Sequence, residues 1–126
     1  SLWLTTREHV DYHAPVVLEK LLEARSTDTV RSRAISGKPA RQLRTAWTEA
    51  WEGPESPGFL PIPLMWMVQA EAVERIYHHS NKPLAGSPVG QIVGSMNEIR
   101  TTAEVMAELI GGCRETLRRM GALAGS

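Results

Sequence analysis

The spacing of apolar positions predicts a mainly helical chain. Between residues 14 and 22, apolar side chains recur at i, i+3, i+4, i+7 and i+8, which places them on one face of a helix. Pro15 is tolerated only in a first turn, so this helix is expected to begin at residues 12–13. Similar spacing over residues 64–76 predicts a second amphipathic helix, which ends near residues 78–81.

A third and longer helix is predicted near the C-terminal end. Thr101–Glu104 has the capping-box pattern, in which a threonine hydroxyl and a glutamate satisfy free backbone donors at the start of a helix. Gly121 suits the end of this helix, and Gly111 and Gly112 weaken its middle by roughly 1 kcal/mol each. Six residues form its apolar face: Met106, Leu109, Ile110, Cys113, Leu117 and Met120. Because Cys113 lies on this face, we expect it to be a small buried apolar residue and not a nucleophile.

Short strands and one more helix are expected in the first half. Leu2–Thr6 is continuously apolar before its hydroxyl residues, which predicts a buried strand of a parallel sheet. The alternation over residues 29–35 predicts a half-exposed edge strand. Ser36–Pro39 predicts a turn, and Pro39 is expected to begin a helix. One face of that helix would carry Ala40, Leu43, Trp47 and Ala50.

Two proline- and glycine-rich stretches predict irregular loops. Residues 53–63 hold four of the eight prolines, and residues 83–94 hold Gly86, Gly90 and Gly94. The fold class that follows is mainly α with one or two short strands.

Composition narrows the classes of function. The 126 residues carry 14 Lys and Arg against 14 Asp and Glu, so the formal net charge is zero. Nucleic acids and anionic membranes attract an excess of positive charge, so neither is expected as a partner. A single cysteine excludes an internal disulfide, and no run approaches the roughly 18 apolar residues of a spanning helix. These features predict a cytoplasmic protein. The opening run Leu2–Leu4, which follows Ser1 without a methionine, suggests a piece of a longer protein.

Charged and histidine side chains offer weak candidates for chemistry. His9 and His13 are four residues apart, but no third ligand accompanies them, and we expect no metal site. Lys38, Arg41 and Arg44 would surround the predicted helix start and could meet a phosphate there, although a solvated face is favoured. No set of nucleophile, base and orienting residue can be argued from order or spacing.

Gln91 is the most ligand-like polar residue of the chain. It follows Gly90 in a loop that bends sharply, and its amide both donates and accepts hydrogen bonds. A purely structural amide explains it equally well.

Several blocks together resemble the C-terminal part of the nitronate monooxygenase family, formerly called nitropropane dioxygenases. The blocks are Ser1–Glu8 (SLWLTTRE), Thr27–Val30 (TDTV), Arg33–Arg44 (RAISGKPARQLR) and Pro88–Gly94 (PVGQIVG), followed by a long final helix. They occur in the family's order and cover most of the chain. The loop over residues 53–63 and the Trp- and Met-rich helix after it lie outside the resemblance.

The resemblance implies a flavin enzyme: an FMN-binding TIM barrel with a smaller, mainly helical domain. Leu2–Leu4 would be the eighth strand, and Ser1 matches the hydroxyl residue with which the family contacts the FMN phosphate. Gln91 would lie near the flavin and the substrate. None of His9, His13, His78 and His79 matches the family's catalytic histidine, so no catalytic residue is expected in this chain.

The resemblance also implies a division of the chain and a set of partners. Residues 1–26 would be the last strand and following helix of the barrel, 27–86 the small helical domain, and 87–126 the glycine loop and C-terminal helix. The partners would be a small-molecule substrate and the N-terminal barrel part of the same protein, with a homo-oligomer as a further option. We expect the isolated chain to be inactive, because a full barrel needs about 250 residues.

Two other functions remain open. Relatives of this family include flavin oxidoreductases that act on enoyl or acyl-CoA thioesters. A non-catalytic helical interaction module is the other alternative, because the apolar Trp and Met side chains must be covered by something.

Overall fold

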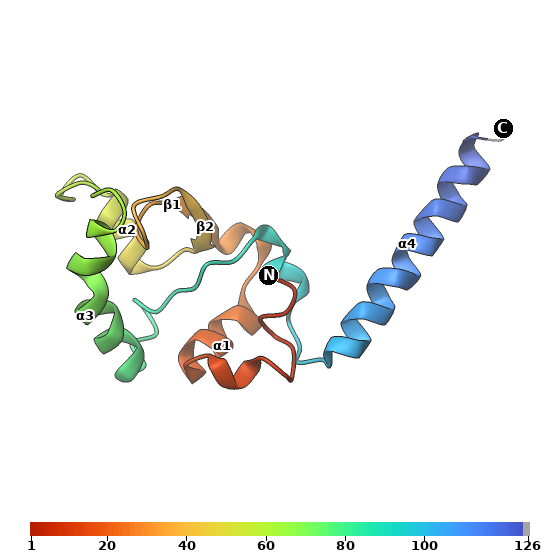
Figure 1. Ribbon diagram of the computed structural model, residues 1–126, viewed down its shortest axis with the longest axis horizontal. Coiled ribbons are helices and arrows are strands. Elements are labelled where there is room, and N and C mark those ends of the chain that lie inside the picture. Colours follow the sequence, from red (N-terminus) through yellow and green to blue (C-terminus); the bar gives the residue numbers. More distant parts are fainter. Residues whose placement is uncertain (125–126) are drawn as a thin grey trace.

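The computed structural model describes residues 1–124, and within them the chain is mainly helical, as predicted (Figure 1). Its α-helices are α1 (Pro15–Glu23), α2 (Ala46–Glu52), α3 (Leu64–His78) and α4 (Thr102–Ala124). Its strands are β1 (Thr29–Ser32) and β2 (Ala40–Leu43). Short 3-10 turns are η1 (Val10–Tyr12), η2 (Ser26–Asp28) and η3 (Gln91–Ser95).

The three amphipathic helices expected from the spacing of apolar residues are confirmed. Pro15 occupies the first turn of α1, where its missing N–H leaves no bond unmade. The capping box of α4 forms as well: the Thr101 N–H donates to Glu104 Oε2 at 2.7 Å, and the Glu104 N–H donates to Thr101 Oγ1 at 3.2 Å. The Thr101 N–H, followed by the Thr101 hydroxyl, which also donates to Glu104 Oε2 at 2.8 Å, holds the pKa of Glu104 below its ordinary value. α4 continues unbroken through Gly111 and Gly112.

The prediction that a helix begins at Pro39 is wrong. Residues Ala40–Leu43 form β2, which pairs antiparallel with β1 in the register Thr29 with Leu43 and Ser32 with Ala40. The helical spacing of Ala40 and Leu43 is overridden because the preceding turn, with Gly37 at φ 81°, folds this stretch back onto β1. The helix begins seven residues later than expected, at Ala46, after the cap residue Thr45, whose hydroxyl accepts from the Thr48 N–H at 3.2 Å.

The buried strand predicted for Leu2–Thr6 is also wrong. These residues form turns, in which the Leu4 N–H donates to the Ser1 carbonyl at 3.0 Å and the Thr6 N–H to the Trp3 carbonyl at 3.1 Å. Only Thr6 pairs with a distant segment, in a single bridge to Arg100. A buried strand needs hydrogen-bonded neighbours on each side, and within residues 1–124 none lies beside this run.

A small core joins α1 to the sheet and to residues 84–93. Its central residues are Val17 and Leu21 from α1, Leu43 from β2, and Val89 and Val93 from the glycine loop. That loop runs beside β2: the Leu43 N–H donates to the Ser87 carbonyl at 3.0 Å, and the Val89 N–H to the Arg41 carbonyl at 3.1 Å. The loop therefore serves β2 as a partial third strand on its free edge.

Lys20 ties α1 to the start of the same loop. Its ammonium donates to the carbonyls of Lys82 at 2.8 Å and Ala85 at 2.6 Å. Burial, followed by the nearby Lys82 cation, lowers the pKa of Lys20. Lys82 in turn binds Glu19 at 2.6 Å and Glu23 at 3.1 Å, so carboxylates of α1 offset the repulsion between the two amines.

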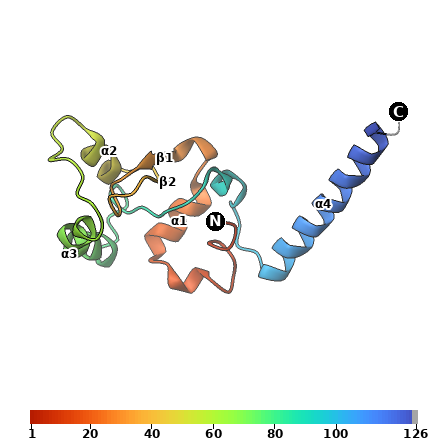
Figure 2. The ribbon, with the colours of Figure 1, turned by 45° about the horizontal axis from the view of Figure 1, so that its top comes forward.

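Two apolar helix faces are left uncovered within the described residues. On α3, the apolar face is covered only in part: Met65 and Ile76 are buried, whereas Leu64 and Val68 are 48% and 62% exposed. α4 extends away from the body in both views (Figures 1 and 2). Within Thr102–Ala124, Val105 is the one buried residue. Cys113 is exposed, so its predicted burial is wrong, and the other members of its apolar face, Met106, Leu109, Ile110, Leu117 and Met120, are exposed as well.

Replacing Lys20 by Met should destabilise the protein by about 1–2 kcal/mol, because it removes two charge-assisted hydrogen bonds to carbonyls. Arg75→Met is the matched control, since it removes an exposed ion pair to Glu71 within α3 and should cost less than about 0.5 kcal/mol. Urea unfolding followed by circular dichroism measures both. Equal losses for the two variants would contradict the role of Lys20.

Gly37→Ala should cost about 2 kcal/mol or more. The residue has a positive φ, and a Cβ there would overlap the Leu60 carbonyl oxygen. Gly111→Ala is the control, because a Cβ at that helical position meets nothing within 4 Å. It should stabilise the protein by roughly 0.5–1 kcal/mol. Thermal unfolding of both variants shows whether the signs differ as expected.

Candidate functional site

The two residues predicted to contact FMN lie side by side. The Gly90 N–H donates to Ser1 Oγ at 3.0 Å, so Ser1 is bonded to the residue immediately before Gln91. Both Ser1 and Gln91 are exposed. Residues 89 positions apart in the chain are therefore brought together, while the roles proposed for them stay predictions.

The geometry leaves the Ser1 hydroxyl proton available. Because Ser1 Oγ accepts from Gly90, its O–H can still donate to an anionic oxygen such as that of a phosphate. Gln91 adds one amide donor group and one acceptor at the same edge of the molecule. These groups fit the phosphate and the polar ring atoms of a flavin nucleotide.

His13 supports the turn that carries Ser1. Its Nε2 lies 3.0 Å from the Leu4 carbonyl oxygen, and the carbonyl accepts, so the neutral ring must carry its proton on Nε2. Partial burial lowers the pKa of His13 below its ordinary 6.5, and the neighbouring His9 acts in the same direction. The folded chain therefore prefers neutral His13.

The structure brings His9 and His13 together, with their ring centroids 5.0 Å apart. The Tyr12 ring stacks on His9 at 5.3 Å. Among residues 1–124, no group of three or more His, Cys, Asp or Glu side chains is arranged to hold a metal ion.

The basic residues proposed to surround a helix start do not do so. Arg41 lies on β2 directly opposite Arg31 of β1, and its guanidinium donates to Thr29 Oγ1 at 3.1 Å. Lys38 lies in the turn and Arg44 beyond the end of β2. Since no helix begins at Pro39, the backbone donors and dipole on which this phosphate site depended are missing there.

A cavity of about 210 Å³, which the amino-acid sequence does not predict, lies beside α3. Its walls come from α2, α3, β2, the turn between β1 and β2, and the loop that begins at residue 84. They are mainly apolar, with Ala34, Trp47, Trp66, Val73, Ile76 and Leu84 among the lining residues. Gln69 also lines it and is only 2% exposed. The amino-acid sequence carried one signal of this cavity. Gln69 precedes Val73 by four residues and Ile76 by seven, which places a polar side chain on the apolar side of α3.

The chain is similar to a protein of Mycobacterium tuberculosis named "Putative monooxygenase Rv1533". The two are 41% identical over 131 aligned positions, which cover 99% of this chain and 34% of that protein. The chain thus spans about a third of the length of the curated relative that it matches. No family model matches the chain, and no solved structure matches it.

The comparison shows that the chain is related to a protein named a putative monooxygenase. The finer expectations (nitronate as substrate, FMN, the TIM barrel, and the division into residues 1–26, 27–86 and 87–126) remain predictions. None of the helices within residues 1–124 has the length and apolar character to cross a membrane.

The lowered pKa of His13 predicts a loss of stability on mild acidification. The unfolded chain binds a proton near pH 6.5, whereas the folded chain binds it only at lower pH, so stability falls as pH decreases through 6.5 toward the folded pKa. We expect the melting temperature to drop between pH 7.5 and pH 5.5. His13→Gln, whose amide can still donate to Leu4, should reduce that drop. An unchanged drop in the variant would show that other groups cause it.

Proposed function

We propose that this chain is the C-terminal part of an FMN-dependent oxidoreductase of the nitronate monooxygenase type. The observation that carries the proposal is the hydrogen bond from Gly90 to Ser1, which gathers both residues singled out by the family resemblance into one exposed site. The similarity to a protein named a putative monooxygenase agrees with it in reaction class. FMN, when bound, would accept electrons from an alkyl nitronate and react with oxygen.

The chain's own residues would bind and orient the cofactor. Ser1 would donate its hydroxyl proton to a phosphate oxygen while it holds the Gly90 N–H. Gln91 would present its amide toward the flavin ring and the substrate. His13 keeps the turn of residues 1–4 in place through the Leu4 carbonyl, and so positions Ser1.

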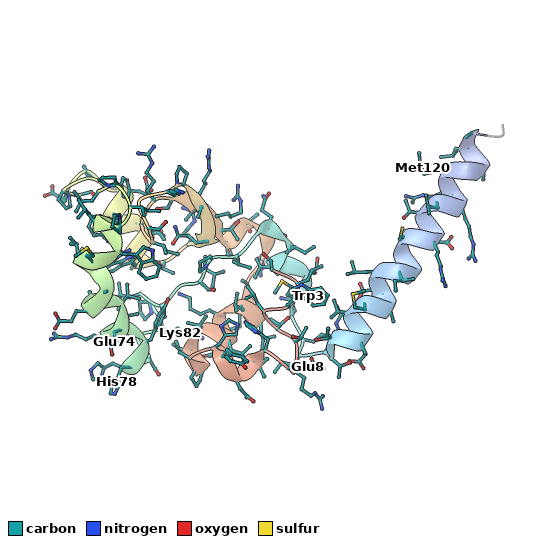
Figure 3. All side chains as sticks on the ribbon, viewed as in Figure 1. Trp3, Glu8, Glu74, His78, Lys82 and Met120 are labelled. Carbon is teal, nitrogen blue, oxygen red and sulfur yellow. The ribbon has the colours of Figure 1, made fainter. Side chains whose placement is uncertain are left out.

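The uncovered helix faces fit the proposed remainder of the protein. α4 is 23 residues long, about 34 Å, and its exposed apolar residues recur with helical spacing: Met106, Leu109, Ile110, Leu117 and Met120. An apolar stripe of this length normally packs on a neighbouring element. We propose that the N-terminal barrel part of the same protein covers it. Met120 lies near the end of α4 that is far from the rest of the chain (Figure 3).

The same apolar faces are the observation that favours the second candidate, a non-catalytic interaction module. That role requires no flavin, so a purified full-length protein that lacks FMN and gains none on addition would support it. An acyl-thioester reductase is separated from a nitronate monooxygenase by the substrate. The first reduces an enoyl thioester with a nicotinamide donor, and the second consumes oxygen with an alkyl nitronate.

Ser1→Ala in the full-length protein should weaken FMN binding by about tenfold, because it removes one hydrogen bond to a charged phosphate. Gln91→Leu should lower kcat/KM for an alkyl nitronate with a smaller effect on FMN affinity. The exposed Ser95→Ala, in the same loop, is the matched control and should alter neither. Flavin fluorescence titration and oxygen consumption measure the two quantities. Unchanged FMN affinity in Ser1→Ala would remove Ser1 from the site.

A further inference from the structure

The cavity beside α3 has aromatic walls that are held in fixed orientations. The Trp47 indole N–H donates to the Ala34 carbonyl at 3.3 Å, and the Tyr77 hydroxyl donates to the Gly86 carbonyl at 2.8 Å. Trp66 contributes a third ring from α3. Fixed aromatic faces favour a flat ligand, because stacking adds to the gain from apolar burial.

Most polar side chains around the cavity are already engaged. Thr45 Oγ1 accepts from the Thr48 N–H as the cap of α2, and the Gln42 amide donates to the Ser32 carbonyl at 3.3 Å. No Asp, Glu, Lys, Arg or His side chain lines the cavity. A charged ligand would lose its hydration there without gaining a partner of opposite charge, so the cavity suits a neutral molecule.

Gln69 differs from the other polar residues of the cavity. Its amide nitrogen donates to the Ile35 carbonyl, which fixes the side chain against the loop before β2. Its oxygen, Oε1, is buried and accepts no hydrogen bond from any residue within 1–124. A buried acceptor without a donor is unfavourable and uncommon in folded proteins, and a ligand that supplies the donor removes this penalty.

We propose that this cavity binds a small, neutral aromatic molecule that carries a single N–H or O–H donor, and that Gln69 Oε1 accepts its hydrogen bond. Trp47, Trp66 and Tyr77 enclose the ring, and Val73 and Ile76 supply the rest of the apolar wall. The site is separate from Ser1 and Gln91, neither of which lines the cavity. The proposal therefore goes beyond the flavin function and does not depend on it.

Indole and benzofuran form a matched pair of probes, because they have nearly the same shape and only indole has an N–H. Titration calorimetry on the full-length protein should show indole binding about tenfold more tightly than benzofuran. Gln69→Leu should abolish this preference while both compounds still bind. Val73→Trp, which fills the cavity from α3, should abolish binding of both. Circular dichroism checks that each variant is folded.

A measurement on the unmodified protein guards against a variant that fails to fold. In a ¹H–¹⁵N spectrum, indole should shift the Gln69 side-chain amide signals, and benzofuran should shift them less. Equal affinity for the two probes, absence of binding, or a preference that survives in Gln69→Leu would overturn the proposal. FMN content is recorded on the same samples, so a failure here is distinguishable from a failure of the flavin function.

Discussion

The pairing of residues 87–89 with the free edge of β2 holds the rest of the structure in place. A two-stranded sheet is marginal by itself, and here the added segment contributes hydrogen bonds through Ser87 and Val89 and places Val89 in the core. At one end of this segment, Gly86 and Pro88 line the cavity beside α3. At the other end, Gly90 reaches Ser1. Both proposed sites therefore depend on one stretch of backbone.

The proposed flavin site and the cavity beside α3 differ in the exposure and pairing of their polar groups. At Ser1 and Gln91 the groups are exposed, neutral hydrogen-bonding groups, which suit a ligand that brings its own charge. Around the cavity the polar atoms are buried and mostly paired within the protein, so the one free acceptor, Gln69 Oε1, stands out among the described residues. Such an acceptor confers selectivity, because a ligand without a donor leaves it unsatisfied.

Residues 1–124 bury only part of the apolar surface of α3 and α4, so their own contacts stabilise these two helices incompletely. α4 is held to the body at its start, where Glu8, labelled in Figure 3, accepts from the Thr102 N–H at 3.0 Å and the Arg7 N–H donates to the Arg100 carbonyl at 2.8 Å. The Thr102 N–H, followed by the N–H of Glu8 itself and the Thr102 hydroxyl, holds the pKa of Glu8 below its ordinary value. The bonds of Thr102 and Arg100 set the direction in which the helix leaves the body. Most stabilisation of an amphipathic helix comes from burial of its apolar face. Residues 1–124 leave most of the apolar face of α4 exposed, so they provide little of this stabilisation.

The amino-acid sequence by itself determined the elements whose signals are local: α1 with Pro15 in its first turn, α3, the capping box of α4, β1, and the two proline- and glycine-rich loops. The tertiary structure decided the conformation of short segments with ambiguous patterns. Ala40–Leu43 became a strand because β1 and the glycine loop lie on either side of it, and Leu2–Thr6 formed turns because no strand lies beside it. Tertiary contacts also decided which apolar residues are buried, and so left Cys113 exposed and Gln69 enclosed. Gln91 was recognisable from the sequence of its own loop. The proximity of Gln91 to Ser1 and the cavity around Gln69 were not recognisable from the sequence. Both depend on contacts between residues far apart in the chain, and local spacing does not specify the geometry of such contacts.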